Sequence, residues 1–287
     1  MQRFLLQFYI MTNWRYWFFG LLSLQILLPG RSVAQGNLLL LPGRVIFEGG
    51  KRYEELNLGN TGKDTARYVI SLMHIRMKED GGFEEISQPD SGESFADQFI
   101  RFFPHSVVLG PGESQVVKIQ LTRINELKPG EYRSHLYFRA IPDKSPLGEE
   151  ETVADTGISV RLIPIFGISI PVIIRVGESN TQVKLSDLSI QMLEDTIPTL
   201  GLTFHRTGNM SVYGDISIYY TSRNGKTIPA GTAKGIAVYT PNQDRRFRMA
   251  LDKKSDIDYH SGRLSVIYNT ADENHPVRIA GADLELR

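Results

Sequence analysis

The sequence of 287 residues contains no cysteine. Disulfide bonds, thiol catalysis, cysteine-ligated zinc and iron–sulfur clusters are therefore excluded. Lysine and arginine together number 32, as do aspartate and glutamate, so the chain also lacks the basic excess that is typical of nucleic-acid-binding domains. We expect no nucleic-acid partner, and a fold that burial and backbone hydrogen bonds stabilise without covalent crosslinks.

Recognisable catalytic patterns are absent as well. No two of the six histidines have metal-ligand spacing, and none stands in a nucleophile motif with serine or aspartate. The glycine-rich turns lack the Lys-Ser or Lys-Thr ending of a phosphate-binding loop. The acidic clusters at 84–85 and 149–151 could supply the paired carboxylates of a glycosidase, yet no feature selects one pair. We therefore expect a non-enzyme without metal or cofactor, and a hydrolase on the same scaffold is the least favoured alternative.

The N-terminus has the layout of a secretory signal peptide. Arginines accompany a short apolar stretch at 17–28, and Ser-Val-Ala at 32–34 fits the small-x-small cleavage pattern. The apolar stretch is too short to span a bilayer comfortably. We predict a cleavable signal peptide over residues 1–34 and an exported mature chain from about Gln35, with the start at Met1 or Met11. An uncleaved membrane anchor is the alternative.

Beyond residue 35 apolar and polar residues alternate with period 2, and glycine and proline turns interrupt the alternation. This pattern predicts an all-β chain of two immunoglobulin-like β-sandwich domains in tandem, at 35–176 and 177–287, with a hinge within 175–180. The strands expected in the first domain are 44–48, 53–58, 65–73, 106–109, 114–121 and 131–140. Those expected in the second are 183–191, 200–205, 214–220, 235–239, 246–251, 263–268 and 277–286.

The sequence LKPGEY, which begins at Leu127 and includes Tyr132, resembles the corner of immunoglobulin-like sandwiches. In that corner a tyrosine hydroxyl bonds back to the upstream backbone. The strand that follows alternates between two faces. Phe138 is expected on the buried face, whereas Arg133 and His135 are expected on the face in contact with solvent.

The stretch 157–175 (GISVRLIPIFGISIPVIIR) has a large or rigid apolar residue at every even position. A typical strand has about 5–6 residues, so this row is longer than one sandwich face needs. The length indicates that part of this row extends beyond its own domain. An ordinary core strand is the alternative. The acidic segment 143–155 before it is expected to be a solvated loop.

Four short motifs resemble those of one known family: GRVIF at 43–47, LGNT at 58–61, YFRAIP at 137–142 and NMSVYG at 209–214. With the signal peptide and the two predicted sandwiches, their order resembles the periplasmic chaperones of the chaperone–usher pilus pathway. The resemblance covers nearly the whole mature chain. It implies a periplasmic chaperone, without cofactor or stable membrane insertion, that binds pilus or other surface-fibre subunits by donor-strand complementation. It also implies delivery of these subunits to an outer-membrane usher.

The same resemblance implies which residues bind the fibre subunit. In the family, an arginine of the first strand lies in a buried cleft, and alternate apolar residues of a long later strand enter the groove of the bound pilin. The subunit-binding residues that this implies are Arg44, Ile158, Val160, Leu162, Phe166, Ile168 and Ile170. The resemblance also implies that residues 158–166 form the donated half of the long strand and that residues 168–174 pack within their own domain.

The chain departs from the family at one position. The family pairs its first-strand arginine with a lysine of the long strand, and the two bind the terminal carboxylate of the pilin. Here Pro171 or Ser169 stands where that lysine is expected, and no lysine occurs in 157–175. Arg44 therefore carries over, whereas the second anchor does not, and Arg161 and Arg175 are the basic residues of the stretch that remain as substitutes.

Two questions stay open on the sequence. A secreted two-domain surface or adhesion protein without chaperone activity would share the same fold. The free protein could also cover its own apolar strand by forming a homodimer. Neither alternative leaves a distinct signature in the residues.

Overall fold

The computed structural model describes residues 38–141, 165–194 and 196–286, and residues Gly36–Arg287 form one compact unit. The described part is nearly all β, with two 3-10 turns, η1 (Asp97–Phe99) and η2 (Ile124–Glu126). Its strands up to residue 176 are β1 (Leu38–Leu41), β2 (Val45–Phe47), β3 (Tyr53–Asn60), β4 (Ala66–Met73), β5 (Ile75–Met77), β6 (Phe83–Glu85), β7 (Ile100–Phe103), β8 (Ser106–Leu109), β9 (Ser114–Leu121), β10 (Gly130–Ile141) and β11 (Gly167–Val176).

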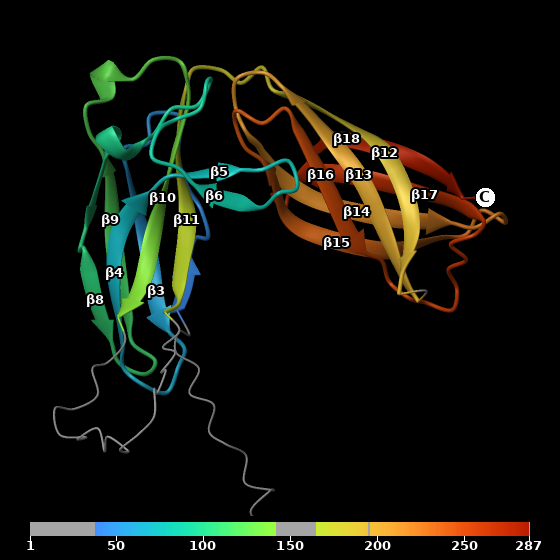
Figure 1. The fold of residues 1–287 in the computed structure, drawn as a ribbon, viewed down its shortest axis with the longest axis horizontal. Helices are drawn as coiled ribbons and strands as arrows, with labels where there is room; N and C mark the ends of the chain where they lie inside the picture. The colour runs from blue at the N-terminus through green and yellow to red at the C-terminus, as the bar shows by residue number, and fades with distance from the viewer. Residues whose placement is uncertain (1–37, 142–164, 195, 287) are drawn as a thin grey trace, which may run out of the picture. The chain divides into compact units, whose positions relative to one another are not determined.

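The strands that follow are β12 (Gln182–Leu193), β13 (Ile197–Thr207), β14 (Val212–Thr221), β15 (Thr227–Val238), β16 (Asp244–Ala250), β17 (Gly262–Thr270) and β18 (Arg278–Leu286). These strands and those before them build two β-sandwiches (Figure 1). The all-β prediction and the two-sandwich prediction are thereby confirmed.

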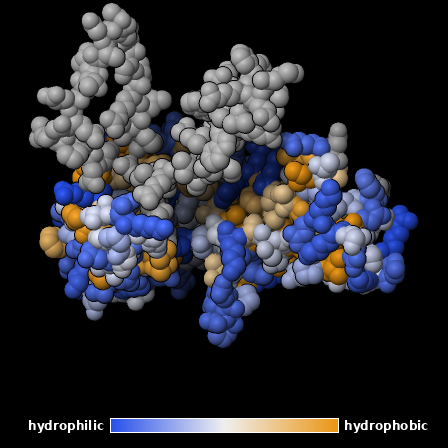
Figure 2. All heavy atoms as spheres, turned by 90° about the horizontal axis from the view of Figure 1, so that it is seen from below, coloured by the Kyte–Doolittle hydropathy of each residue, from blue (hydrophilic) through white to orange (hydrophobic). Residues whose placement is uncertain are grey.

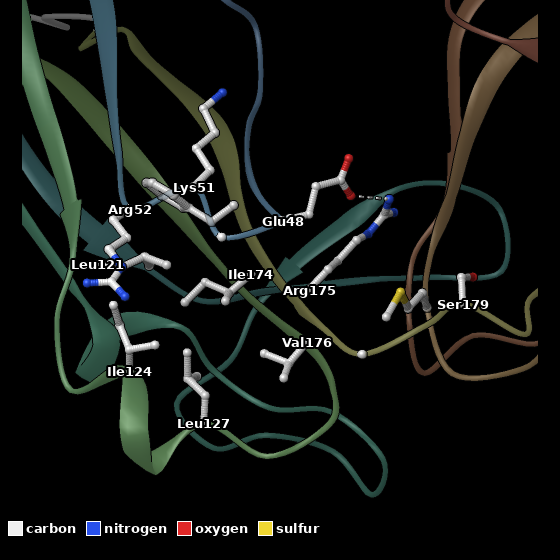
Figure 3. Close-up of a pocket in the computed structure, with 15 residues that line it drawn as sticks. Glu48, Lys51, Arg52, Leu121, Ile124, Leu127, Ile174, Arg175, Val176 and Ser179 are labelled. Carbon is white, nitrogen blue, oxygen red and sulfur yellow. Dashed lines mark ion pairs between the residues drawn. The ribbon is translucent and has the colours of Figure 1, made fainter.

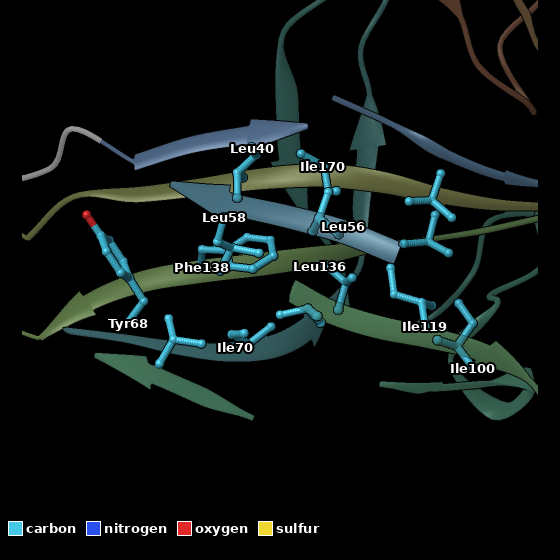
Figure 4. Packing of buried hydrophobic residues seen from close by; sticks show 14 of the residues in the cluster. Leu40, Leu56, Leu58, Tyr68, Ile70, Ile100, Ile119, Leu136, Phe138 and Ile170 are labelled. Atoms are coloured by element: carbon cyan, nitrogen blue, oxygen red, sulfur yellow. The ribbon is translucent and has the colours of Figure 1, made fainter. Parts of the chain in front are cut away.

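The first sandwich packs a sheet of order β1-β3-β9-β7 against a sheet of order β2-β11-β10-β4-β8. Alternate side chains of both sheets point inward and form one core, in which Leu56, Leu136 and Phe138 are fully buried (Figure 4). Ile170 of β11 packs in the same core. Nearly all pairs are antiparallel, but β2 pairs parallel with β11 through Val172–Val45 to Ile174–Phe47.

The second sandwich packs β12-β13-β16 against β15-β14-β17-β18. Its core is separate and centres on Phe204 and Tyr268, whose rings meet edge to face at 5.1 Å between centroids. Strands β5 and β6 form a two-stranded ribbon of their own. Two cores agree with two domains, while the boundary between 176 and 177 stays a prediction.

Every strand expected from the period-2 pattern is present, with ends that shift by a few residues. Strands β8 and β9 have the predicted bounds. The pattern missed β1, because four consecutive leucines do not alternate, and missed β5 and β6, because each is only three residues long. It also missed β7 and placed the start of β15 eight residues too late.

The predicted tyrosine corner is confirmed. The hydroxyl of Tyr132 accepts a hydrogen bond from the backbone N–H of Lys128 at 2.9 Å and donates to the Lys128 carbonyl at 3.3 Å. These bonds fix the entry of β10 into the sheet, and β10 in turn carries β11 along its whole length, from Gly130–Val176 to Arg139–Gly167.

Apolar side chains also remain on the surface, where they are interspersed with hydrophilic ones on the face that Figure 2 shows. Isolated exposed apolar residues are normal in proteins, so a functional argument needs a cluster with unpaired backbone beside it. Within the described ranges, no helix is long and apolar enough to cross a membrane.

Candidate functional site

Strand β11 changes its environment along its length. Its inner half is core, since Ile170, Val172 and Ile174 are at most 4% exposed. By contrast, the residues 165–169 are all exposed, with Phe166 at 50% and Ile168 at 39%. Both belong to the same even-numbered row as the buried residues, so the row continues past the end of its own core.

The backbone of this outer half is paired on one side only. Strand β10 lies along all of β11, and the backbone N–H of Ala140 extends the ladder to the Phe166 carbonyl at 2.9 Å. On the other side, β2 reaches only residues 172–174. Among the described strands, 167–171 therefore has an unpaired edge, which is a template for another strand.

Gly167 is required where the outer half begins. A side chain there would meet the ring of Tyr137 on β10, because a Cβ atom would lie 2.3 Å from the Tyr137 hydroxyl oxygen. The ring of Tyr137 thus lies directly against the β11 backbone at this point. Tyr137 therefore packs against one face of the strand at Gly167, while Phe166 remains 50% exposed.

Arg44 immediately precedes β2. Val45 and Phe47 anchor that strand with their side chains in the core, each 1% exposed. The guanidinium of Arg44 stacks on the ring of Tyr213, with its central carbon 3.8 Å from the ring centroid. Tyr213 belongs to β14, so this cation–π contact joins the first sandwich to the second.

The three guanidinium nitrogens of Arg44 are buried and have no hydrogen-bond partner among the residues that the structure describes. Leaving a buried polar group unsatisfied costs about 1–3 kcal/mol, and more when it is charged. The five N–H donors of an arginine suit a carboxylate that binds two of them at once. Arg44 is therefore poised for an anion.

A cavity of about 290 Å³ lies beside Arg44. Its walls come from both sandwiches and are largely apolar or aromatic. They include Met77 and Phe83 of the β5–β6 ribbon, Pro171 of β11 and Tyr239. Among the described residues that line it, none is an aspartate or glutamate. The cavity therefore offers positive charge in a partly open pocket that has no acidic group of its own among the described residues.

His135 of β10 also lines this cavity and is 3% exposed. The expectation that Arg133 and His135 face solvent is wrong. Tyr239 of the second sandwich covers both, with the Arg133 guanidinium 4.5 Å from its ring and the His135 ring edge-on at 6.5 Å. Burial, together with the positive charge of Arg133 and His74, lowers the pKa of His135 to about 3. His135 is therefore neutral at physiological pH.

A buried cluster of polar groups also joins the two sandwiches. The side chain of Glu131 is 0% exposed. One of its oxygens accepts hydrogen bonds from the backbone N–H of Ser211 at 3.0 Å, the Ser211 hydroxyl at 2.8 Å and Nε of Arg175 at 3.1 Å. The other oxygen accepts from the Thr240 hydroxyl at 3.3 Å. Arg175 also donates to the Ser211 carbonyl at 2.9 Å, so every charge in this cluster is matched.

A larger cavity of about 490 Å³ opens at the same end of β11, beside Ile174 and Val176 (Figure 3). Arg175 of β11, which lines this cavity, already has ion-pair partners. Arg175 points toward Glu48, with their nearest atoms 3.5 Å apart, and also bonds Glu131. Arg175 is thus already paired, and the acidic Glu48 stands among the residues that line this cavity, whereas no described acidic residue lines the cavity at Arg44.

The structure brings some of the predicted subunit-binding residues together. Arg44 lines the smaller cavity, and Pro171, five residues beyond Phe166, lines it too. Phe166 and Ile168 lie on the exposed end of the apolar row. Ile170 is 4% exposed and belongs to the first core. This removes Ile170 from the predicted contact surface. Three further predicted residues, Ile158, Val160 and Leu162, lie outside the described residues.

Sequence reasoning missed the groups that surround Arg44. Tyr213 and Tyr239 come from the second sandwich, and no local pattern links them to the first strand. The glutamate of the LKPGEY corner, Glu131, was visible as a charged residue that opens a largely buried strand. Such a residue has to find partners when it is buried. Among the described residues, no cluster of three or more His, Asp or Glu could hold a metal ion.

No family model matches the chain, and no curated protein matches its sequence. Solved structures of fimbrial chaperones do match. CfaA, a class 5 fimbriae chaperone, has 14% identity and a TM-score of 0.43, over 88% of this chain and 99% of that one. The Pseudomonas aeruginosa CupB2 chaperone has 13% identity and a TM-score of 0.41, over 87% and 100%. A structure of the Salmonella enterica SafA pilin in complex with the SafB chaperone has 14% identity and a TM-score of 0.41, over 86% and 97%.

The Glu131 cluster predicts a large loss of stability in Glu131→Gln. The substitution removes the buried negative charge and leaves Arg175, whose side chain is 20% exposed, without its main partner. We expect the free energy of unfolding, measured by urea titration, to fall by about 3 kcal/mol. The control Glu126→Gln breaks an exposed pair with Arg123 and should leave the titration unchanged. Equal curves for the two variants would contradict the account.

The buried neutral His135 predicts a pH dependence. Its folded pKa of about 3 lies below the unfolded value of about 6.5, so the unfolded chain binds a proton that the folded chain does not. Stability from this group is complete above about pH 6.5 and is lost as the pH falls toward 3. Between pH 7.5 and 5, the wild type should lose about 2 kcal/mol more than His135→Gln. Urea titrations at both pH values check this.

The exposed His275 supplies the matched control for that measurement, with a side chain that is 88% exposed. His275→Gln should keep the pH profile of the wild type. If His135→Gln lost as much stability as the wild type over this range, burial of a neutral His135 would be refuted.

Proposed function

We propose that this chain is a periplasmic chaperone that binds pilus or other surface-fibre subunits by strand donation and hands them to an outer-membrane usher. One observation carries the proposal. The outer half of β11 combines an unpaired backbone edge with the exposed apolar side chains of Phe166 and Ile168. An edge of this kind normally invites aggregation, so it needs a partner that covers it.

An incoming strand of a fibre subunit would satisfy both features. Its backbone would pair with the free backbone groups along 167–171, where Pro171 offers only a C=O, and pockets in the subunit would receive alternate side chains. Phe166 is 50% and Ile168 39% exposed, so completing their burial would contribute about 1 kcal/mol each before ordering costs are subtracted. The predicted donor residues Ile158, Val160 and Leu162 would extend the same row.

Arg44 supports the second part of the proposal. Its unpartnered guanidinium and the cavity beside it suit the terminal carboxylate of a bound polypeptide. Pro171 of β11 lines this cavity, so a polypeptide anchored there could continue along the edge of β11 toward Phe166. Anchoring its end would fix the register in which its strand pairs, since a slip of one residue turns every side chain to the wrong face.

The remaining parts of the proposal come from the sequence. The predicted signal peptide over 1–34 would direct export, and we propose that the two sandwiches correspond to domains at 35–176 and 177–287. We propose no catalytic step and no cofactor, because strand exchange needs only the difference in binding free energy between two partners. A homodimer of the free protein through β11 belongs to the same proposal, because a second copy of the chain and a fibre subunit would compete for the same strand edge.

The test is co-expression of the full chain with candidate fibre subunits, followed by co-purification. Phe166→Asp should reduce the recovered fibre protein at least about tenfold, because a carboxylate would have to enter an apolar pocket. Arg44→Gln should also reduce recovery. The matched control is Val277→Asp, which places the same charge on an exposed apolar residue of the second sandwich, 63% exposed.

The control should recover as much fibre protein as the wild type. Undiminished recovery with Phe166→Asp would contradict strand donation. It would favour a secreted surface protein that merely shares the fold.

A further inference from the structure

The proposed function leaves one gap, and the inference that follows rests on that function. A carboxylate held by Arg44 alone has one cationic partner, and the stretch 157–175 contains no lysine to act as a second. The sequence left Arg161 and Arg175 as substitutes. Arg175 is committed to Glu131 and Glu48, and Arg161 lies outside the described residues.

A second guanidinium does line the cavity, from the other sandwich. Arg245 on β16 reaches it, although it lies 70 residues beyond Arg175 in the chain. One of its terminal nitrogens donates to the carbonyl of Ala237. Its Nε atom is buried and has no partner among the described residues. Arg245 therefore keeps a free N–H inside the cavity wall.

The position of Arg245 is held from two sides. Its guanidinium lies against the turn of the β5–β6 ribbon, where a Cβ atom on Gly81 would be 2.7 Å from Nη2. Gly81 has a φ of +83°, a conformation that favours glycine. On the other side the Ala237 carbonyl fixes the terminal nitrogen. A side chain held in this way loses little further freedom on binding a ligand.

The charges around the cavity do not balance. Arg44 and Arg245 both line it, and no described acidic side chain does. Arg133 of β10 does not line the cavity, and its charge is paired with Glu93 at 2.6 Å, with both side chains 2% exposed. His135 is uncharged at neutral pH, as argued above. Two arginines with free donors thus share a cavity that has no counter-ion of its own.

We propose that Arg245 is the second cation of the carboxylate site, so that the terminal carboxylate of a bound polypeptide is held between Arg44 of the first sandwich and Arg245 of the second. The ligand class is a peptide that ends in a free carboxylate next to an apolar or aromatic side chain. Phe83, Tyr213 and Tyr239 would contact that side chain.

This assignment has a structural consequence. A carboxylate bridged by Arg44 and Arg245 would tie the two sandwiches together at the cavity, in addition to the Glu131 cluster. Because β5–β6 positions Arg245 through Gly81, this ribbon becomes part of the site. The alternative is that Arg245 serves only to satisfy the Ala237 carbonyl, in which case its removal would not affect anion binding.

The experiment uses N-acetyl-phenylalanine as the probe and its C-terminal amide as the uncharged twin. Each is titrated into the full-length mature protein, and NMR chemical shifts give the dissociation constants. The wild type should prefer the carboxylate over the amide by at least about tenfold. Arg245→Gln should weaken carboxylate binding about tenfold and leave amide binding unchanged. Arg248→Gln, an exposed arginine on the same strand, is the matched control and should bind as the wild type does.

Arg245→Lys guards against a folding defect in the glutamine variant. It keeps the charge but loses the planar fork, so its affinity for the carboxylate should fall between those of the wild type and Arg245→Gln. Equal affinities for carboxylate and amide in the wild type would overturn the proposal, and so would unchanged carboxylate binding in either Arg245 variant.

The outcome separates this inference from the proposed function. Phe166→Asp should bind the probe like the wild type, because Phe166 does not line the cavity. If Phe166→Asp still captured fibre proteins while Arg245→Gln lost the probe, strand donation would fail and the carboxylate site would stand. If Phe166→Asp lost the fibre protein while both Arg245 variants bound the probe normally, strand donation would stand and the role of Arg245 would fail.

Discussion

The rest of the structure depends on one strand that is longer than the core it serves. The even-numbered row of β11 is buried at Ile170, Val172 and Ile174 and emerges at Phe166 and Ile168. A strand cannot hide one end of such a row by twisting, because its side chains alternate strictly between two faces. The same backbone that builds the first core must therefore present apolar surface beyond it. The strand that stabilises the first core is therefore also the strand that exposes an apolar edge.

The cavity adds a second constraint, because it exists only where two sandwiches meet. Arg44 comes from the first sandwich, and Tyr213, on whose ring the Arg44 guanidinium stacks, comes from the second. The Glu131–Arg175–Ser211 cluster supplies the matched charges that hold this meeting place. The Glu131 cluster at one end of β11 has its charges paired, whereas Arg44 and Arg245, near the middle of β11, have no acidic partner among the described residues that line their cavity. The two groups therefore have different consequences. The first stabilises the fold, and the second leaves a site for an anion.

Much of this was accessible from the sequence, for a physical reason. Strand positions and the Tyr132 corner follow from local periodicity and turn chemistry, which act over a few residues. The expectation that 168–174 packs entirely within its own domain is wrong at Ile168, which is 39% exposed, so the buried part of the row begins at Ile170. The burial of His135 and the position of Arg245 do not. Both depend on side chains more than 100 residues away in sequence, since Tyr239 covers His135 and the ribbon at Gly81 supports Arg245. Period-2 reasoning also treats each sandwich as an isolated body, so it assigned to solvent a face that the second sandwich covers.

The central claim is that the outer half of β11 becomes a paired strand in a complex. Amide hydrogen exchange of residues 165–169, with and without a bound fibre protein, tests it most directly. The account predicts that amides on the free edge become at least about a hundredfold more protected on binding, while amides of the inner half, already paired, change little. Unchanged exchange of the outer half in a complex that has formed would contradict the account.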